Sequence, residues 1–175
     1  SLAEMVNEGV RRAYSHPDNK LRASVLSDPA GKRTNTKDNT PAVVNMKVVC
    51  GDKVDVIVAA KGGGSEAKSK FAMLNPSDSI VDWVIKTVPT MGAGWCPPGM
   101  LGIGIGGTAE KAMLMAKQSL MEDIDMAELK ARGPSNRTEA LRIELCDKVN
   151  ALGIGAQGLG GLTTVLDVKI MDYPT

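Results

Sequence analysis

The stretch Gly99–Met121, GMLGIGIGGTAEKAMLMAKQSLM, carries the clearest structural pattern of the chain. Its apolar beginning, residues 100–105, is typical of a buried strand, and Gly106, Gly107 and Thr108 lead into a helical pattern over residues 109–121. A strand that runs through a glycine turn into a helix is typical of folds that combine helices with a sheet. This stretch therefore sets the fold class, and the other elements are predicted around it.

Further helices are predicted from apolar spacing and capping residues, at 2–14, from Asn75-Pro76 onward, at 126–131, and from Ser135 or Asn136 to about 152. Alternating apolar residues predict strands at 42–49, 54–60 and 162–170, the first two joined as a hairpin by residues 50–53. Residues 20–41 are polar and predict a long loop. The predicted class is mixed α/β (α+β), a single domain whose central sheet, mostly antiparallel or mixed, is flanked by helices.

The composition is that of an ordinary globular protein of 175 residues, long enough to bury a real core. A formal net charge of +1 and an aromatic content of 3% give no argument for a nucleic-acid partner. No apolar run reaches the roughly 18 residues of a membrane span, and the first residues lack signal-peptide character. We expect a cytoplasmic protein with neither a nucleic-acid nor a membrane partner.

Glycine is concentrated in three segments, 62–64, 92–107 and 153–161. Residues 102–107 match the GxGxxG pattern of dinucleotide-binding folds, but the second buried strand and the acid expected about 20 residues later are missing. An anion site at the start of the following helix, or close packing of the glycines, remains open instead. Lys61–Ser65 lacks P-loop spacing, although three consecutive glycines let backbone N–H groups approach a ligand.

The three cysteines lie far apart, so each is interpreted separately. Cys96 stands in WCPPG, residues 95–99, where prolines stiffen the backbone and glycines nearby leave the thiol uncrowded. This environment suits a metal or cluster ligand, a nucleophile or a structural cysteine. Cys50 and Cys146 are interpreted as structural, and the single histidine, His16, as a surface or capping residue. Because a hydrolytic triad would need that histidine, a self-contained hydrolase is disfavoured.

Three long strings together resemble one family. They are AAKGGGSEAKSKFAMLNPSD at 59–78, VPTMGAGWCPPGMLGIGIGGTAEKAMLMAK at 88–117, and NALGIGAQGLGG at 150–161 followed by TTVLDVKI at 163–170. They look like the N-terminal (alpha) portion of class I, iron–sulfur-dependent fumarate hydratases and L(+)-tartrate dehydratases. The likeness covers essentially the whole chain.

The resemblance implies a four-iron–four-sulfur cluster held by three cysteines, with one iron left open as a Lewis acid for the substrate. Cys96 matches the middle cluster cysteine of the family, whereas the other two cysteines match none. Arg22 resembles the arginine that contacts a substrate carboxylate, and Gly64 the glycine whose backbone contacts the substrate. Lys61, Asn35 and Gln157 sit in matching strings and are further substrate-binding candidates without individual roles.

By the same resemblance, the remaining cluster cysteines and a catalytic histidine lie outside residues 1–175. We therefore expect a fumarase class I N-terminal (alpha) domain truncated at both ends, with no catalytic base of its own. The implied substrate is a C4 dicarboxylate or hydroxy-dicarboxylate. The implied protein partner is a C-terminal domain or beta subunit, within a homo- or hetero-oligomer. We expect negligible turnover by the chain alone.

Two other classes of function stay open from the residues. One is a non-catalytic module that binds a small anion or nucleotide through the loops at 62–64 and 102–107. The other is an interaction subunit whose exposed faces serve only to meet a beta-type partner. Titration with dicarboxylates and nucleotides would separate the first from a hydro-lyase, and restoration of activity by a partner would separate the second.

Overall fold

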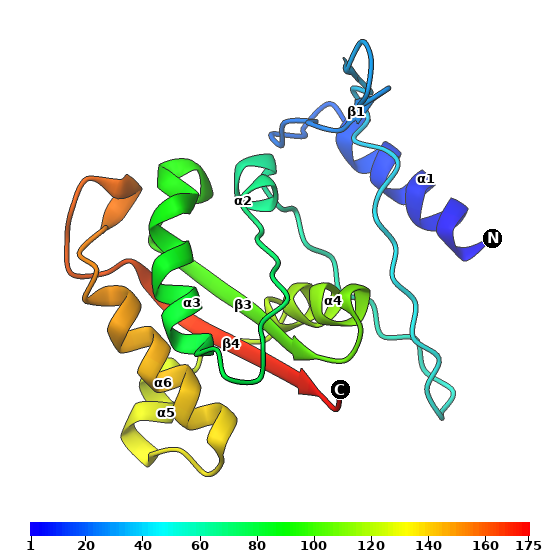
Figure 1. Ribbon diagram of the computed structural model, residues 1–175. Helices are drawn as coiled ribbons and strands as arrows, with labels where there is room; N and C mark the ends of the chain where they lie inside the picture. Colours follow the sequence, from blue (N-terminus) through cyan, green and yellow to red (C-terminus); the bar gives the residue numbers. More distant parts are fainter. The chain divides into compact units, whose positions relative to one another are not determined.

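A computed structural model describes all 175 residues, and the chain divides into two compact units, Ser1–Asp55 and Val56–Thr175 (Figure 1). Each unit is described by itself. Both helices and strands are present, which confirms the mixed α/β class. No helix combines the length and the apolar character needed to cross a bilayer.

The first unit begins with helix α1, Leu2–Ser15, which confirms the helix predicted at 2–14. Ser1 caps it, since its hydroxyl accepts from the backbone N–H of Glu4 while the Glu4 carboxylate reaches back to the amino terminus. The polar loop that follows contains a small antiparallel pair, β1 (Leu26–Ser27) and β2 (Thr34–Asn35). The predicted loop is therefore confirmed, with one short ladder inside it.

Asparagine side chains hold this polar loop in shape. The Asn39 Oδ1 atom accepts from the backbone N–H groups of Ser24 and Val25 at 2.9 and 3.2 Å, and Asn7 Oδ1 accepts from the N–H of Ala42 at 2.7 Å. Such side-chain bonds replace the backbone ladders that an extended loop lacks. The polar composition of residues 20–41 is thus a structural requirement of the loop.

In the second unit, β3 (Gly99–Gly106) runs directly into α4 (Ala109–Ser119), as the opening stretch predicted. From Leu101 to Gly106, glycines alternate with Leu101, Ile103 and Ile105, so this part of β3 has one face without side chains. A Cβ atom on Gly104 would lie only 1.9 Å from the carbonyl oxygen of Ala112 in α4. The glycine face therefore lets the helix backbone pack directly on the strand.

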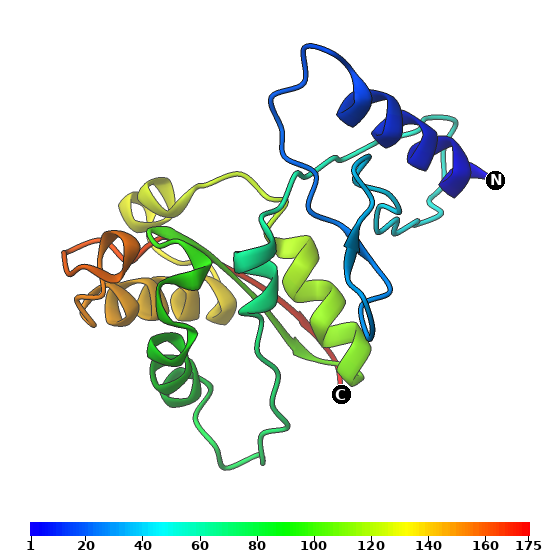
Figure 2. The same cartoon turned by 90° about the horizontal axis from the view of Figure 1, so that it is seen from above.

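The other face of the sheet covers the main core. Strand β4 (Val165–Tyr173) pairs with β3 in parallel, and Leu101 and Ile103 lie opposite Val168 and Ile170. Helices α3 (Ile80–Thr87) and α6 (Arg137–Asn150) lie on the side away from α4 (Figures 1 and 2). The completely buried members of this core include Leu129, Leu145, Val149 and Val168. Helix α5 (Met126–Arg132) contributes Leu129.

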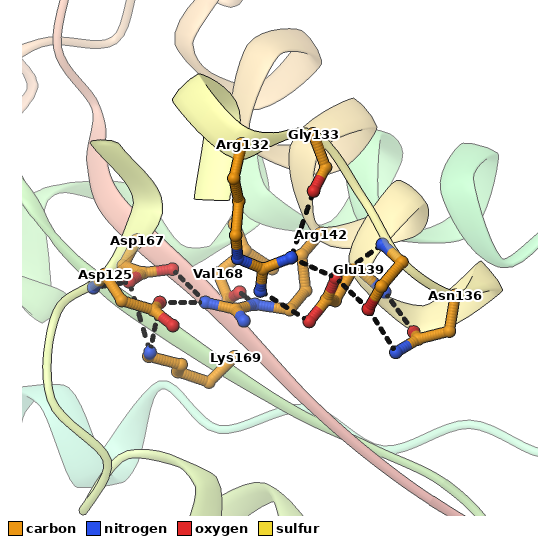
Figure 3. Close-up of polar contacts among 10 residues, drawn as sticks. Asp125, Arg132, Gly133, Asn136, Glu139, Arg142, Asp167, Val168 and Lys169 are labelled. Carbon is orange, nitrogen blue, oxygen red and sulfur yellow. Dashed lines mark hydrogen bonds and ion pairs between the residues drawn. The ribbon is translucent and has the colours of Figure 1, made fainter. Parts of the chain in front are cut away.

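A buried ion cluster fixes α6 and the start of α5 to β4 (Figure 3). Asp167 and Lys169 point from β4 toward Arg142 of α6 and Asp125, the residue before α5. The Arg142 Nε atom also donates to the backbone carbonyl of Val168 at 2.7 Å. Two carboxylates and two cations meet here, so the group is neutral overall and its buried charges are paired.

The predicted hairpin at 42–49 and 54–60 is wrong, because these residues are extended but form no ladder. Their side chains stay in water, with exposed fractions of 90% for Val43, 98% for Val48 and 83% for Val58. An alternating pattern shows that a segment would suit a sheet, and it does not supply a partner strand. Within the 175 residues this segment finds none.

Two element boundaries also differ from prediction. Asn75 does not cap a helix; it forms a turn with Asp78, and α3 begins at Ile80 with Ser79 as its cap. The last strand starts three residues later than predicted, at Val165, because residues 156–161 and their neighbours are occupied by a tight glycine loop. The predicted N-cap of α6 is confirmed, since Asn136 Oδ1 accepts from the N–H of Glu139 at 2.9 Å.

Candidate functional site

Cys96 lies at the end of η1 (Val88–Trp95), immediately before the two prolines that lead into β3. Its backbone is left-handed, with φ 59° and ψ 55°, and its N–H donates to the carbonyl of Ala93 at 2.9 Å. A left-handed non-glycine residue stores backbone strain that the surrounding structure must maintain. The side chain is exposed, and its sulfur has only a weak 3.9 Å contact with the carbonyl of Gly94. The thiol is therefore free to take a ligand.

Gly64 packs against the cysteine turn, which comprises residues 93–97. It belongs to the short helix α2 (Gly63–Ala67), and a Cβ atom added to it would lie 2.5 Å from the carbonyl oxygen of Gly94. Only glycine permits that approach. The fold thus brings the 62–64 and 92–96 glycine segments together, although about thirty residues separate them in the sequence.

Two lysine side chains pair with Glu66 of α2. Lys61 Nζ is 3.4 Å from Glu66 Oε2, and Lys117 of α4 donates a hydrogen bond to the same oxygen. The bond from Lys117, followed by the field of Lys61, holds the pKa of Glu66 below its ordinary value although partial burial opposes this. One carboxylate thus meets two ammonium groups, and the cluster carries a net positive charge beside the glycines.

Gln157 also contacts the cysteine turn. It lies in η2 (Ala156–Gly158), and its backbone N–H donates to the carbonyl of Pro97 at 2.7 Å. Its side-chain nitrogen lies 3.5 Å from the same oxygen. Three predicted candidates, Gly64, Cys96 and Gln157, therefore converge, and Lys61 flanks them.

Arg22 and Asn35 lie in the first unit. Arg22 is exposed and forms no ion pair, while the carbonyl of the next residue, Ala23, accepts from Asn35 Nδ2 at 2.9 Å. Asn35 Oδ1 accepts from the N–H of Lys37 at 2.7 Å. The amide of Asn35 is therefore committed to the loop that carries Arg22, whose guanidinium remains available for a carboxylate.

The remaining thiols and the histidine are each described within their own unit. Cys146 is 2% exposed in the core, and burial raises the pKa of its thiol. Cys50 is exposed in a turn of the other unit, and His16 is an exposed helix-end residue that accepts from the N–H of Asp18. No three His, Cys, Asp or Glu side chains are grouped so that they could hold a metal ion. Cys96 fits the implied cluster as one ligand of a shared site.

The GxGxxG segment is accounted for by packing. Cβ atoms on Gly102 and Gly104 would lie 2.3 and 1.9 Å from backbone carbonyl oxygens of α4. A Cβ atom on Gly106 would lie 2.1 Å from the carbonyl oxygen of Tyr173. These glycines face protein atoms, so the close-packing explanation is the one that the structure favours over a nucleotide site.

Sequence reasoning missed Glu66, Lys68 and Lys117 as neighbours of the site. Lys68 packs over Gly94, where an added Cβ would meet its Cε at 2.5 Å. The available signal was local for Glu66 and Lys68, which follow the glycine run by two and four residues. Lys117 could not have been found this way, because its approach depends on how α4 packs.

Comparison with known proteins identifies the family of the chain. The putative L(+)-tartrate dehydratase subunit alpha of Methanocaldococcus jannaschii is 37% identical over 97% of this chain and 59% of its own length. The L(+)-tartrate dehydratase subunits alpha of Escherichia coli and Shigella sonnei are 27% and 26% identical over 97% of this chain and 55% of their own lengths. The chain thus spans somewhat more than half of these relatives. The family model described as fumarate hydratase (fumerase) matches residues 1–175, and the chain belongs to that family.

Proposed function

We propose that this chain is the substrate- and cluster-binding part of a hydro-lyase that reversibly adds water to a C4 dicarboxylate. It would correspond to the N-terminal (alpha) domain of a class I fumarate hydratase or an L(+)-tartrate dehydratase. Family membership over residues 1–175 supports the reaction class. The observation that carries the proposal is the exposed Cys96 thiol on a left-handed backbone, in a turn whose Gly94 packs against Gly64 and Lys68.

The chain's own residues supply binding and orientation. Cys96 would provide one thiolate ligand, and a bound four-iron–four-sulfur cluster would supply a Lewis-acidic iron for the substrate hydroxyl. Arg22 would clamp a carboxylate through two parallel N–H bonds. Gly64 would contact the substrate through its backbone, while its missing Cβ makes room for the carbonyl of Gly94. The net positive charge of Lys61, Lys117 and Glu66 favours a dianionic substrate nearby.

The reaction also needs groups that this chain does not offer. Dehydration removes a proton from one carbon while the C–O bond on the next carbon breaks and oxygen keeps both electrons, so a base must face the first carbon. No group of three His, Cys, Asp or Glu side chains that could hold a metal ion is formed by residues 1–175. A C-terminal domain or beta subunit would provide the base and the other cluster ligands. The relatives named as alpha subunits support this division.

The test uses the enzyme assembled with its C-terminal domain or beta-type partner. It measures turnover of fumarate, malate and L(+)-tartrate, which also decides between the two substrates. Arg22→Met should lower kcat/KM about 10- to 100-fold, the effect of losing charge-assisted hydrogen bonds. Arg33→Met is the matched control, because Arg33 lies in the same loop and its guanidinium donates only to the carbonyl of Pro29. Turnover of none of these acids by the assembled enzyme would refute the proposal.

The chain alone should show no measurable turnover, since Cys96 is the only exposed cysteine of the second unit and no group of three metal-binding side chains is formed. The measurement is hydration of fumarate under anaerobic conditions after incubation with iron and sulfide. Addition of the partner should restore activity. Equal activity with and without the partner would show that the site is complete within these residues.

A further inference from the structure

The glycine loop, residues 153–161, closes on itself in a way that only glycine allows. Its two limbs are joined by hydrogen bonds from the N–H of Gly160 to the carbonyl of Ile154 at 2.8 Å and from Gly161 to Gly153 at 3.2 Å. A Cβ atom on Gly155 would lie 2.2 Å from the carbonyl carbon of Gly160. Any larger residue at 155 would force the limbs apart.

The closed loop is tied to the rigid part of the second unit. The N–H of Gly155 donates to the hydroxyl of Thr164 at 3.1 Å, and Thr164 is completely buried. Asn150, at the end of α6, accepts from the N–H of Thr164 at 2.7 Å. The carbonyl of Thr164 in turn accepts from the N–H of Gly99, where β3 begins. Helix, loop and strand are thereby joined through one buried residue.

From this base the loop touches the cysteine turn on both sides of Cys96. Gln157 donates its N–H to the carbonyl of Pro97, the residue after the cysteine, at 2.7 Å. A Cβ atom on Gly158 would lie 3.3 Å from the Cβ of Ala93, whose carbonyl accepts from the N–H of Cys96. Gln157 itself is left-handed, with φ 54°. The loop is thus held in a strained form where it meets the turn.

We propose that the glycine loop is a brace that fixes the direction of the Cys96 thiol, with Gly155 and Gln157 as positioning residues. The left-handed backbone of Cys96 requires support from its neighbours, and the loop is the element that bonds to the residue following it. Preorganised ligands bind a metal group more tightly because less ordering remains to be done on binding. The part of the inference that concerns a cluster rests on the proposed function, whereas the bracing itself does not.

The test measures the mobility of a nitroxide spin label on Cys96 in the full chain, without iron. Cys50→Ser serves as the background, and buried Cys146 should stay unlabelled. Gly155→Ala and Gly153→Ala form a matched pair. Both glycines have φ +67°, but a Cβ on Gly153 meets nothing within 4 Å. Both variants therefore place an alanine at positive φ, where the ψ of −172° at Gly155 adds backbone strain of its own, and only the Gly155 methyl meets the facing limb of the loop.

The electron paramagnetic resonance spectrum should show an immobile label in the background protein and in Gly153→Ala, and a clearly mobile component in Gly155→Ala. If Gly155→Ala fails to fold, Gly158→Ala replaces it, because its added methyl presses on the Ala93 Cβ at 3.3 Å and meets backbone only at an ordinary contact distance of 3.8 Å. Labels of equal mobility in the matched variants, or in Gly158→Ala and the background, would overturn the brace.

A second readout links the brace to the cluster. In the assembled enzyme, Gly155→Ala should retain less iron than Gly153→Ala during dilution with a chelator, by about fivefold, the factor that corresponds to roughly 1 kcal/mol. The two proposals fail separately. A mobile label with unchanged iron retention would leave the brace standing and remove Cys96 from the ligand set.

Discussion

Replacing Arg142 by methionine should destabilise the fold strongly, because the guanidinium is the hub of the buried ion cluster. The change removes the bond to the Val168 carbonyl at 2.7 Å and the contact with Asp167 at 3.1 Å, together with the hydrogen bond to Asp125. Asp167 has no exposed side-chain area, and Lys169 remains 3.3 Å from it. The cluster changes from neutral to a charge of −1, with the Asp167 carboxylate fully buried.

The expected loss of unfolding free energy is about 3–5 kcal/mol, as for other broken buried pairs. Three bonds to charged or buried groups would suggest about 5–9 kcal/mol if they were independent, at about 1.5–3 kcal/mol each, but Lys169 continues to offset part of the charge. Methionine preserves most of the side-chain volume, so the loss reflects the charge and the hydrogen bonds, with little contribution from a cavity.

Urea unfolding followed by circular dichroism measures this loss. With a slope of about 1–3 kcal/mol per molar urea, the midpoint should fall by about 1–5 M. Lys148→Met is the control on the same helix, because Lys148 pairs with Glu144 while both side chains are about half exposed, and it should cost at most about 0.5 kcal/mol. Urea midpoints that agree within error for the two variants would refute the claim that the ion cluster stabilises the fold strongly.

Three further outcomes follow from the same structure. Gly104→Ala should lower the free energy of unfolding by about 1–3 kcal/mol, because the added methyl would overlap the backbone of α4. Gly9→Ala is the control and should be neutral or stabilising, because its methyl meets nothing within 4 Å. Equal melting temperatures for the two variants would contradict the close packing of α4. Hydrogen bonds from Arg142 first and Lys169 second hold the pKa of the Asp125 carboxyl well below 3.8. The contribution of Asp125 to folding stability is therefore present above pH 3.8 and is lost as the pH falls below it. Asp125→Asn should flatten the dependence of unfolding free energy on pH in acid, and an unchanged dependence would contradict the pairing. A thiol reagent should modify two cysteines in the native chain and Cys146 only after unfolding; three fast-reacting thiols would contradict its burial.

The sequence was sufficient for elements whose signals are local. The apolar run before Gly106 and the helical spacing after Thr108 predicted β3 and α4, and Asn136 marked the start of α6. These predictions succeeded because propensity, capping and burial point to the same element. The failures arose where a local pattern needed a distant partner. The valine-rich segment 42–60 has the alternation of strands, yet a ladder forms only when a second strand is within reach.

The candidate site was likewise predictable from the sequence only where its signals are local. Cysteine, glycine and proline spacing identified Cys96 as a stiff, uncrowded thiol, and the structure shows it exposed in a left-handed turn. The contacts of Gly64 with Gly94 and of Gln157 with Pro97 join segments thirty and sixty residues apart. No single-sequence pattern specifies such pairs, because they depend on how α2 and the glycine loop pack. The resemblance to a family selected the residues, and the fold shows which of them meet.

The most direct test of the account is the iron and acid-labile sulfide content of the assembled enzyme, purified without oxygen, in cysteine variants of this chain. Cys96→Ser should lose most of the iron, the sulfide and the visible absorption of the cluster, while Cys50→Ser should retain all three. Full iron and sulfide content in Cys96→Ser would contradict the assignment of this thiol as a cluster ligand, whatever the remaining activity.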